Sequence, residues 1–406
     1  MLRQLARGAG GVALGTALGQ GTVVAVTPWL ARSHTPADFG ALALVTTVSN
    51  VAVAGACLRY DLALPSAAAN QSRPLMVVGI ACALGSAALV TGIDAVASLL
   101  SHHTLLDPFT NPWIVGLCVL LTGLYQLALA WATRQGAFSR VGAMRCAQGS
   151  GFSVLAASHF LDLVPAYVVS FLTAIPELLG AVRSAAPKEV TPYEAARVHW
   201  QFPLVSLPGA LLDVIGYSLC IWIISANYGA SEAGQYSQVQ RLVGAPLMLL
   251  GMSLGQVLLR HSANFANDPA RMAQLFSQAL KGMGALGLIV VLLTAGIGEP
   301  LLHSLLGGQW RVNTMFITPI ALAVAVRACT SPLSMILVTL RRFELSLRWQ
   351  AAYFASATTV FWLATRHLDV GTFVIIYAAH ECLFYGAYLL LIQFAINTSP
   401  CAASSA

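Results

Sequence analysis

The stretch WIVGLCVLLTGLYQLALAWAT, residues 113–133, contains no charged side chain and is mostly apolar. A helix needs about 20 such residues to cross the hydrocarbon core of a bilayer, so this stretch is long enough to span a membrane. Eleven more apolar stretches lie in the rest of the chain, before and after it. The twelve predicted spans cover residues 9–30, 39–58, 75–100, 113–133, 143–160, 163–182, 203–226, 234–258, 276–297, 312–338, 346–365 and 370–396.

The composition of the whole chain also indicates a membrane protein. Apolar residues make up 57% of its 406 residues and charged residues only 9%, whereas an average soluble domain has about 25% charged residues. So few charges cannot cover the surface of a soluble globule, and a chain this apolar is not disordered. We therefore predict an all-α polytopic membrane protein with twelve transmembrane helices.

The lysine and arginine residues predict which helix ends face the cytoplasm, because cytoplasmic loops are enriched in both. With both termini in the cytoplasm, three basic residues fall on the outer side: Arg32, Arg311 and Arg366. Fifteen fall on the cytoplasmic side: Arg3, Arg7, Arg59, Arg73, Arg134, Arg140, Arg145, Arg183, Lys188, Arg197, Arg260, Arg271, Arg341, Arg342 and Arg348. We therefore attribute the net charge of +6 to topology and to anionic lipid heads, not to nucleic acid.

The N-terminal run is predicted to be a retained helix rather than a cleaved signal peptide. Signal peptides have an apolar core of about 7–15 residues, whereas this run continues to Leu30. Gly11, Gly15 and Gly19 recur at every fourth position, a spacing that lets two membrane helices approach closely. The eight cysteines form no CxxC pair and avoid the predicted outer loops. We therefore expect no disulfide, no metal site and no cofactor.

The longest polar stretch, residues 183–201, divides the chain into two halves of six predicted helices each. We expect an N-terminal lobe over residues 1–182, a cytoplasmic linker over 183–201, a C-terminal lobe over 202–396 and a short cytoplasmic tail over 397–406. Six helices in each half would give both halves the same orientation, so the lobes form a parallel pseudo-repeat. Transporters built from such repeats bind substrate at the repeat interface.

A short sequence similarity between the two halves supports the repeat. Asp38 and Gly40 open the second predicted helix, and Glu232 and Gly234 open the eighth, 194 residues later. The loops are too short to form a separate domain, and the chain has no Walker-type glycine loop. The sequence therefore predicts a carrier that does not hydrolyse nucleotides.

Few ionisable side chains lie inside the predicted spans, and each is a functional candidate because a charge inside a bilayer is costly. Arg241 and Arg327 lie in the eighth and tenth predicted helices, and a guanidinium binds phosphate through two parallel hydrogen bonds. Both are predicted to bind an anionic head group in a central cavity. Asp213, His380 and Glu381 are candidates for binding a coupling proton or sodium ion. The alternative is that these acids and arginines only pair with each other.

Three more charged residues lie near the ends of predicted spans. Arg59 and Asp61, in the run Arg59-Tyr60-Asp61, end the second helix on the cytoplasmic side. They form either an entry site for a charged head group or a flank with a local ion pair. Glu177 lies near the inner end of the sixth helix.

Two motifs resemble those of enzymes, but neither predicts one. His380-Glu381 begins like the HExxH zinc motif, yet Phe384 occupies the position of the second histidine. Residues 251–255 spell GxSxG, which in hydrolases needs a strand–turn–helix setting. Here it lies inside a predicted helix, where glycines four residues apart favour helix packing.

The order of several short motifs carries a resemblance to a known family. The first half contains TPADFG at 35–40 and LRYDLALP at 58–65. The second half contains Phe202-Pro203 with Ser206 and Pro208, Gly234-Gln235-Tyr236 with Arg241, Leu242 and Pro246, GGQW at 307–310 and SPLS at 331–334. Together they resemble Wzx-type polysaccharide flippases of the multidrug/oligosaccharidyl-lipid/polysaccharide (MOP) exporter superfamily. One departure is Asp61, where the family more often has glutamate; another is the scarcity of charges in the spans of the first lobe.

This resemblance implies two six-helix lobes, a cationic central cavity and alternating access. It implies the translocation of undecaprenyl-pyrophosphate-linked oligosaccharide repeat units across the bacterial inner membrane, for O-antigen, capsule or exopolysaccharide synthesis, without covalent chemistry. The implied partners are this lipid-linked oligosaccharide and membrane lipids, with the polysaccharide polymerase machinery as a further candidate.

Two alternatives stay open. A cation-coupled multidrug antiporter of the same superfamily is the first, although central arginines disfavour a cationic substrate. A membrane polysaccharide polymerase or ligase is the second. Such enzymes usually carry a large outer loop, and the longest predicted outer loops here have only about a dozen residues.

Overall fold

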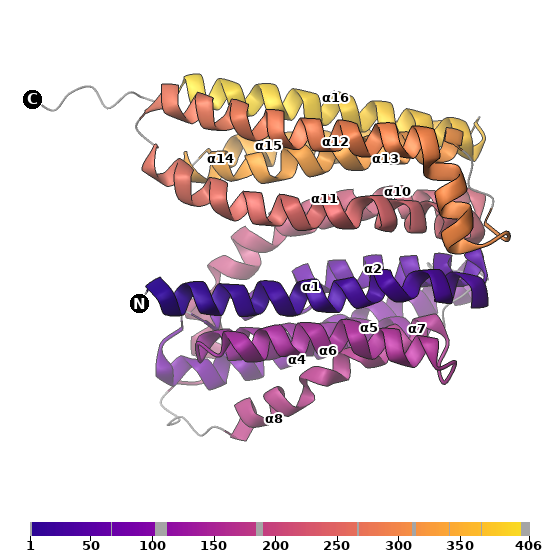
Figure 1. Ribbon diagram of the computed structural model, residues 1–406. Helices are drawn as coiled ribbons and strands as arrows, with labels where there is room; N and C mark the ends of the chain where they lie inside the picture. Colours follow the sequence, from indigo (N-terminus) through magenta and orange to yellow (C-terminus); the bar gives the residue numbers. More distant parts are fainter. Residues whose placement is uncertain are drawn as a thin grey trace, which may run out of the picture. The chain divides into compact units, whose positions relative to one another are not determined.

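The computed structural model describes residues 2–65, 67–101, 112–183, 190–265, 268–310, 314–340, 342–366 and 368–398. All regular structure in these ranges is helical. Lys188, Arg311, Arg341, Cys401 and most of the predicted tail lie outside them. Contacts divide the chain into two compact units, Met1–Ser218 and Leu219–Ala406, and the long helices within each unit run side by side (Figure 1).

Unit 1 holds six long helical runs and a short helix that follows them. Its elements are α1 (Leu2–Ser33), α2 (Pro36–Gly55), α3 (Tyr60–Ala63), α4 (Ala69–Ser101), α5 (Pro112–Arg134), α6 (Phe138–Ala157), α7 (Leu163–Ser170), η1 (Phe171–Ala174), α8 (Ile175–Arg183), α9 (Pro192–Val198), the π-helical turn η2 (Phe202–Ser206) and the first half of α10 (Leu207–Tyr228).

The predicted glycine spacing in the first helix places α1 directly against α6. A Cβ atom on Gly15 would lie 2.1 Å from the carbonyl oxygen of Gly142, and one on Gly149 would lie 2.4 Å from that of Gly19. The two backbones therefore touch, which only residues without a side chain permit. The close helix packing predicted from Gly11, Gly15 and Gly19 is confirmed.

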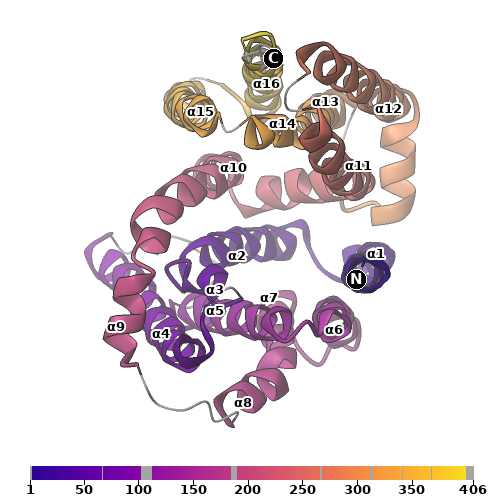
Figure 2. The same cartoon turned by 90° about the vertical axis from the view of Figure 1, so that its left-hand side faces the viewer.

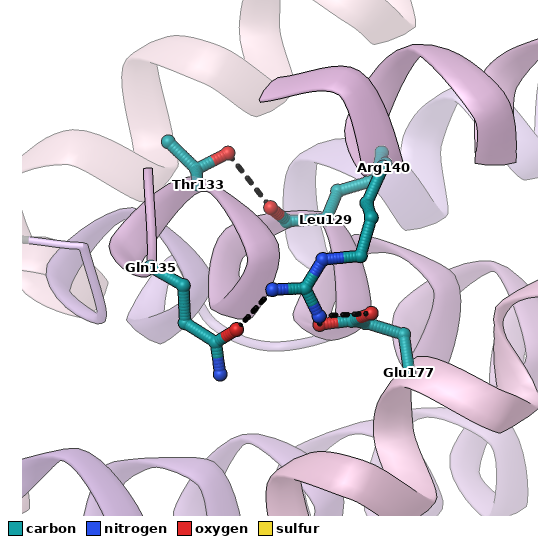
Figure 3. A network of polar contacts seen from close by, with 5 residues as sticks. All are labelled: Leu129, Thr133, Gln135, Arg140 and Glu177. Carbon is teal, nitrogen blue, oxygen red and sulfur yellow. Dashed lines mark hydrogen bonds and ion pairs between the residues drawn. The ribbon is translucent and has the colours of Figure 1, made fainter. Parts of the chain in front are cut away.

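The sixth predicted span is broken into α7, η1 and α8. The tight turn before it contains His159 with a left-handed φ of 54°. After the break, Glu177 in the first turn of α8 accepts hydrogen bonds from Nη1 of Arg140, at 2.9 Å to each carboxylate oxygen. The other terminal nitrogen of Arg140 donates to the side chain of Gln135 (Figure 3). This network attaches α8 to the start of α6 and to the end of α5.

Unit 2 is a bundle arranged around one central helix. Its elements are the second half of α10, α11 (Ala230–Asn264), α12 (Pro269–Leu306), α13 (Thr314–Thr330), η3 (Ser331–Ser334), α14 (Met335–Thr339), α15 (Phe343–Thr365) and α16 (Val370–Asn397). Helix α13 packs on α11, α12 and α16, and α15 packs on α16 (Figure 2).

Every predicted span lies on a helical run in the described residues, apart from residues 312 and 313 of the tenth, which fall outside them. Eight of these runs are long and apolar enough to cross a membrane by length and composition. The second span ends at Gly55 rather than at residue 58, because Leu58 and Arg59 adopt left-handed backbone conformations that no helix accommodates.

The predicted linker contains a helix of its own. Residues Pro192–Val198 form α9, which packs against α4 within unit 1 (Figure 2). The contacts change from one unit to the other between Ser218 and Leu219, inside α10, and not within residues 183–201.

Candidate functional site

Arg327 and Glu381 form an ion pair inside unit 2. Arg327 lies on α13 and Glu381 on α16, and these two helices pack along each other. The Nη1 atom of Arg327 lies 3.9 Å from Oε2 of Glu381. The Glu381 side chain is fully buried, whereas 18% of the Arg327 side chain is exposed. The Arg327 side chain is therefore mostly buried, and a fully buried carboxylate lies beside its guanidinium.

Two tyrosines hold this pair in place. The hydroxyl of Tyr353 on α15 donates a hydrogen bond to Oε1 of Glu381 at 2.5 Å. The guanidinium carbon of Arg327 lies 5.4 Å from the ring centre of Tyr385 and 5.9 Å from that of Tyr353. Both distances are within the range of cation–π attraction. Three helices thus combine to fix one arginine.

A second row of aromatic side chains supports these tyrosines. The ring of Trp349 stacks on that of Tyr388 with centroids 4.2 Å apart. Its indole N–H donates to the carbonyl oxygen of Phe384 at 3.0 Å. Because this bond satisfies the polar atom of Trp349, its ring can pack between α15 and α16 at little cost.

His380 lies next to Glu381 in sequence and shares one neighbour with it, because its ring centre lies 5.4 Å from that of Tyr353. Its Nε2 atom lies 3.1 Å from the Ser356 hydroxyl. Its ring stacks on Phe384 with centroids 4.5 Å apart and meets Phe361 edge-on. The side chain is buried. The structure therefore brings His380, Glu381 and Arg327 into one region, as three predicted site residues of the C-terminal lobe.

Arg241 lies on α11, the helix that packs beside α13, so the helices that carry the two predicted anion-binding arginines are neighbours. Its side chain is half-buried. The polar side chains of Gln235 and Gln238, from the preceding turns of α11, are buried. Helix α11 thus places several polar groups inside unit 2.

Arg59 and Asp61 lie together in unit 1, at a turn with unusual backbone geometry. Arg59 has a φ of 66°, and among the described residues its buried Nε atom has no hydrogen-bond partner. Asp61 is buried at the start of α3. Burial raises the pKa of Asp61, and the nearby positive charge of Arg59 partly opposes this increase. Arg59 and Asp61 thus lie close enough for the charge of one to act on the other.

Other contacts hold this turn in position. Arg134, at the end of α5, donates from Nη1 to the carbonyl oxygens of Leu64 and Ala67, at 3.0 and 2.5 Å. These bonds attach the residues that follow α3 to the end of α5. A non-glycine residue in the left-handed region costs on the order of 1–3 kcal/mol, so such contacts are needed to keep Arg59 in its conformation.

Asp213 lies in the first half of α10 and its side chain is exposed. Leu211, two residues before it, packs against Gly55 of α2, with a methyl carbon 3.2 Å from the position a Cβ would occupy. An exposed carboxylate within a candidate span, Phe202–Tyr228, is unfavourable against lipid. Asp213 is therefore a candidate for contact with water or with cargo.

Sequence reasoning did not identify the aromatic partners of Arg327. Trp349 and Tyr353 are four residues apart on α15, and Tyr377 and Tyr385 lie one turn before and after Glu381 on α16. The available signal for these partners was the four-residue spacing of the aromatic residues, together with the acidic residue between Tyr377 and Tyr385.

The described residues contain no group of three or more histidine, cysteine, aspartate or glutamate side chains that could hold a metal ion. The GxSxG run at 251–255 lies within the continuous helix α11, not at a strand–turn–helix junction. A methylene carbon of Pro332 lies 3.4 Å from the position of a Cβ on Gly251. This glycine is used for packing.

A family profile described as "polysaccharide biosynthesis protein" matches residues 29–314, which is 286 of the 406 residues. The chain belongs to this polysaccharide biosynthesis protein family. No curated protein sequence matches it.

Solved structures share the fold of this polysaccharide biosynthesis protein. An inward-facing MATE family multidrug transporter of the MOP superfamily has a TM-score of 0.70 and 11% identity, covering 96% of each chain. The lipid II flippase MurJ in an inward closed conformation has a TM-score of 0.71 and 10% identity, covering 97% of this chain and 88% of that one. A MOP superfamily transporter from Pyrococcus furiosus has a TM-score of 0.58 and 10% identity, covering 96% and 95%.

These comparisons confirm the predicted fold class and the predicted family resemblance. The polysaccharide biosynthesis protein is a multi-pass, all-α membrane protein with the twelve-helix fold of MOP superfamily transporters. At identities of 10–11%, the neighbours establish the fold and not the cargo.

Proposed function

We propose that this protein is a flippase that moves undecaprenyl-pyrophosphate-linked oligosaccharide repeat units across the bacterial inner membrane by alternating access. The observation that carries the proposal is Arg327, a guanidinium inside a helical bundle that lies over two tyrosine rings and beside a buried carboxylate, with 18% of its side chain exposed. Arginine suits a pyrophosphate because its planar fork binds two oxygens at once. Membership of a polysaccharide biosynthesis family supports a glycan cargo.

The other predicted site residues receive roles in the same cycle. Arg241, on the helix beside α13, is proposed to contact the same head group, and Arg59 to meet it at the cytoplasmic entry together with Asp61. Glu381, His380 and Asp213 are proposed to bind a coupling proton or sodium ion. The carboxylate of Glu381 also neutralises Arg327 while no anion is bound.

The test is transport of a fluorescent polyprenyl-pyrophosphate sugar in reconstituted vesicles. Arg327→Ala alone leaves Glu381 buried without its counter-charge, which can unfold the protein. The Arg327→Ala/Glu381→Gln double variant removes both charges and is the safer comparison. A charged hydrogen bond contributes about 1.5–3 kcal/mol, so transport should fall by about tenfold or more.

Arg366→Ala is the matched control. Arg366 also lies on an aromatic ring, with its guanidinium carbon 3.7 Å from the centre of Trp362, but outside the proposed site. This variant should transport normally. Wild-type transport by the Arg327→Ala/Glu381→Gln variant would remove the anion site from the proposal. Wild-type transport of a cationic dye without transport of the lipid would instead favour the multidrug antiporter.

A further inference from the structure

Helix α9, between the sixth and seventh helical runs, has two different faces. Its N-terminus is fixed by a capping box, in which the Thr191 backbone N–H and hydroxyl donate to the Glu194 carboxylate. The backbone bond and then the hydroxyl bond lower the pKa of Glu194, so its charge is used locally, by the helix itself.

The inner face of α9 is attached to unit 1. Ala195 is completely buried. The hydroxyl of Tyr60 donates to the carbonyl oxygen of Ala196 at 3.4 Å, and Nε2 of His199 lies 3.1 Å from the side-chain oxygen of Gln71 on α4. Burial lowers the pKa of His199, so it is neutral at neutral pH. These contacts fix the rotation of α9 about its own axis.

Tyr193, Arg197 and Val198 on α9 and Trp200 in the turn after it are exposed, and we call these four residues the α9 face. Tyr193 and Arg197 are four residues apart and lie on one side of the helix, opposite the buried Ala195. Tyr193 is 73% exposed and Trp200 is 49% exposed. Arg197 is the one charged side chain among the four residues of the α9 face.

This surface lies close to the bilayer. Val198 is four residues before Phe202, where the candidate span Phe202–Tyr228 begins. An extended chain covers at most about 3.6 Å per residue, so Val198 lies within roughly 14 Å of the start of the span. Leu204, in the first turn of that span, is 69% exposed. The apolar surface thus continues from α9 into a segment long and apolar enough to cross the membrane.

We propose that the α9 face inserts into the lipid head-group region of the leaflet beside it and anchors the linker to the membrane surface. Tyrosine and tryptophan are enriched at this depth because their rings are apolar and their tips are polar. Arginine can extend its guanidinium to lipid phosphates while its stem remains in apolar surroundings. A short amphipathic helix with such residues lies in the interface plane.

The anchor has a consequence for the turn that carries Arg59. Tyr60 binds α9 and follows Arg59 directly. A lipid-anchored α9 therefore holds Arg59 and Asp61 at the level of the head groups. This lipid contact does not depend on which cargo the protein moves.

Fluorescence of Trp200 tests the proposal in the full-length protein. The spectrum of Trp200→Phe is subtracted from that of the wild type, both reconstituted in vesicles of phosphatidylcholine and phosphatidylglycerol. The Trp200 component should be quenched by lipids brominated near the head group more strongly than by lipids brominated near the acyl terminus. It should resist aqueous iodide.

Trp113→Phe is the matched control. Trp113 is mostly exposed and begins the candidate span Trp113–Arg134, so its component should respond to brominated lipid in the same way. If iodide quenches Trp200 while brominated lipid does not, the α9 face is open to water or to a soluble partner and the proposal is wrong.

A second variant keeps the test independent of the tryptophan substitution. Val198→Asp places a carboxylate on the α9 face at a side chain that is 60% exposed. Trp200 should then lose part of its quenching by brominated lipid and become more accessible to iodide. Quenching identical to that of the wild type would also contradict the proposal.

Discussion

At the scale of the residue, the contact between α1 and α6 makes a sharp prediction. In Gly15→Ala the new Cβ would lie 2.1 Å from the backbone oxygen of Gly142, so one helix must move. Overpacking of this kind costs about 1–3 kcal/mol, and the midpoint of thermal unfolding in detergent should fall. Gly21→Ala on the same helix is the control, because nothing lies within 4 Å of its Cβ position. Alanine favours helix by about 0.8–1 kcal/mol over glycine, so equal stability of the two variants would contradict the packing.

Single residues also show how far sequence reasoning reaches. Arg327 and Glu381 could be selected because a charge in an apolar stretch is costly and therefore conspicuous. Their partners Tyr353 and Tyr385 were not selected, because aromatic residues are common in apolar helices and their spacing beside Glu381 does not say which helix α16 packs against. The contact between helices α13, α15 and α16 is a property of tertiary packing.

At the scale of the element, the two aspartates that begin α7 and α16 allow a paired experiment. Asp369 accepts hydrogen bonds from the backbone N–H groups of Gly371 and Thr372 and from the Thr372 hydroxyl. Asp162 occupies the same position before α7 but makes no such side-chain bond. Asp369→Ala should therefore lower the unfolding midpoint at neutral pH, whereas Asp162→Ala should leave it almost unchanged.

The effect of Asp369 should depend on pH. The hydrogen bonds from Thr372, and then from Gly371, lower the pKa of Asp369 in the folded state, below the value of about 3.9 of an unfolded chain. The carboxylate therefore stabilises the fold above about pH 4, and this contribution is lost as the pH falls through the lowered pKa. The difference in midpoint between wild type and Asp369→Ala should shrink on acidification. A constant difference would mean that the charge is not involved.

The existence of the helices, which depends on the length of an apolar stretch, was predicted well. The positions of their ends and breaks, which depend on backbone geometry, were predicted less well. All twelve long stretches are helical, because an apolar segment in a bilayer must satisfy its own hydrogen bonds. The end of α2 at Gly55 and the break at Phe171–Ala174 were not predicted. Both arise from local φ and ψ values that apolar periodicity does not report.

At the scale of the whole molecule, the division of the chain differs from the division that polarity indicates. Residues 183–201 are polar and read as a linker, yet α9 packs on unit 1 through Ala195, Tyr60 and Gln71. Those partners are distant in sequence, so composition alone does not reveal them. The start of α10 also lies with unit 1, because Leu211 and Leu207 pack beside Gly55 of α2.

The orientation of the molecule in its membrane is a prediction of charge distribution. Fifteen basic residues on one side against three on the other favour cytoplasmic termini, because positive loops are retained inside. Green fluorescent protein fused after Ala406 should fluoresce, and alkaline phosphatase fused there should be inactive. Phosphatase fused after Phe160, in the exposed turn between α6 and α7, should be active, because an odd number of spans precedes it. The opposite pattern at both positions would invert the topology, and would place the Arg59 turn and α9 on the outer face, away from a cytoplasmic donor of lipid-linked sugar.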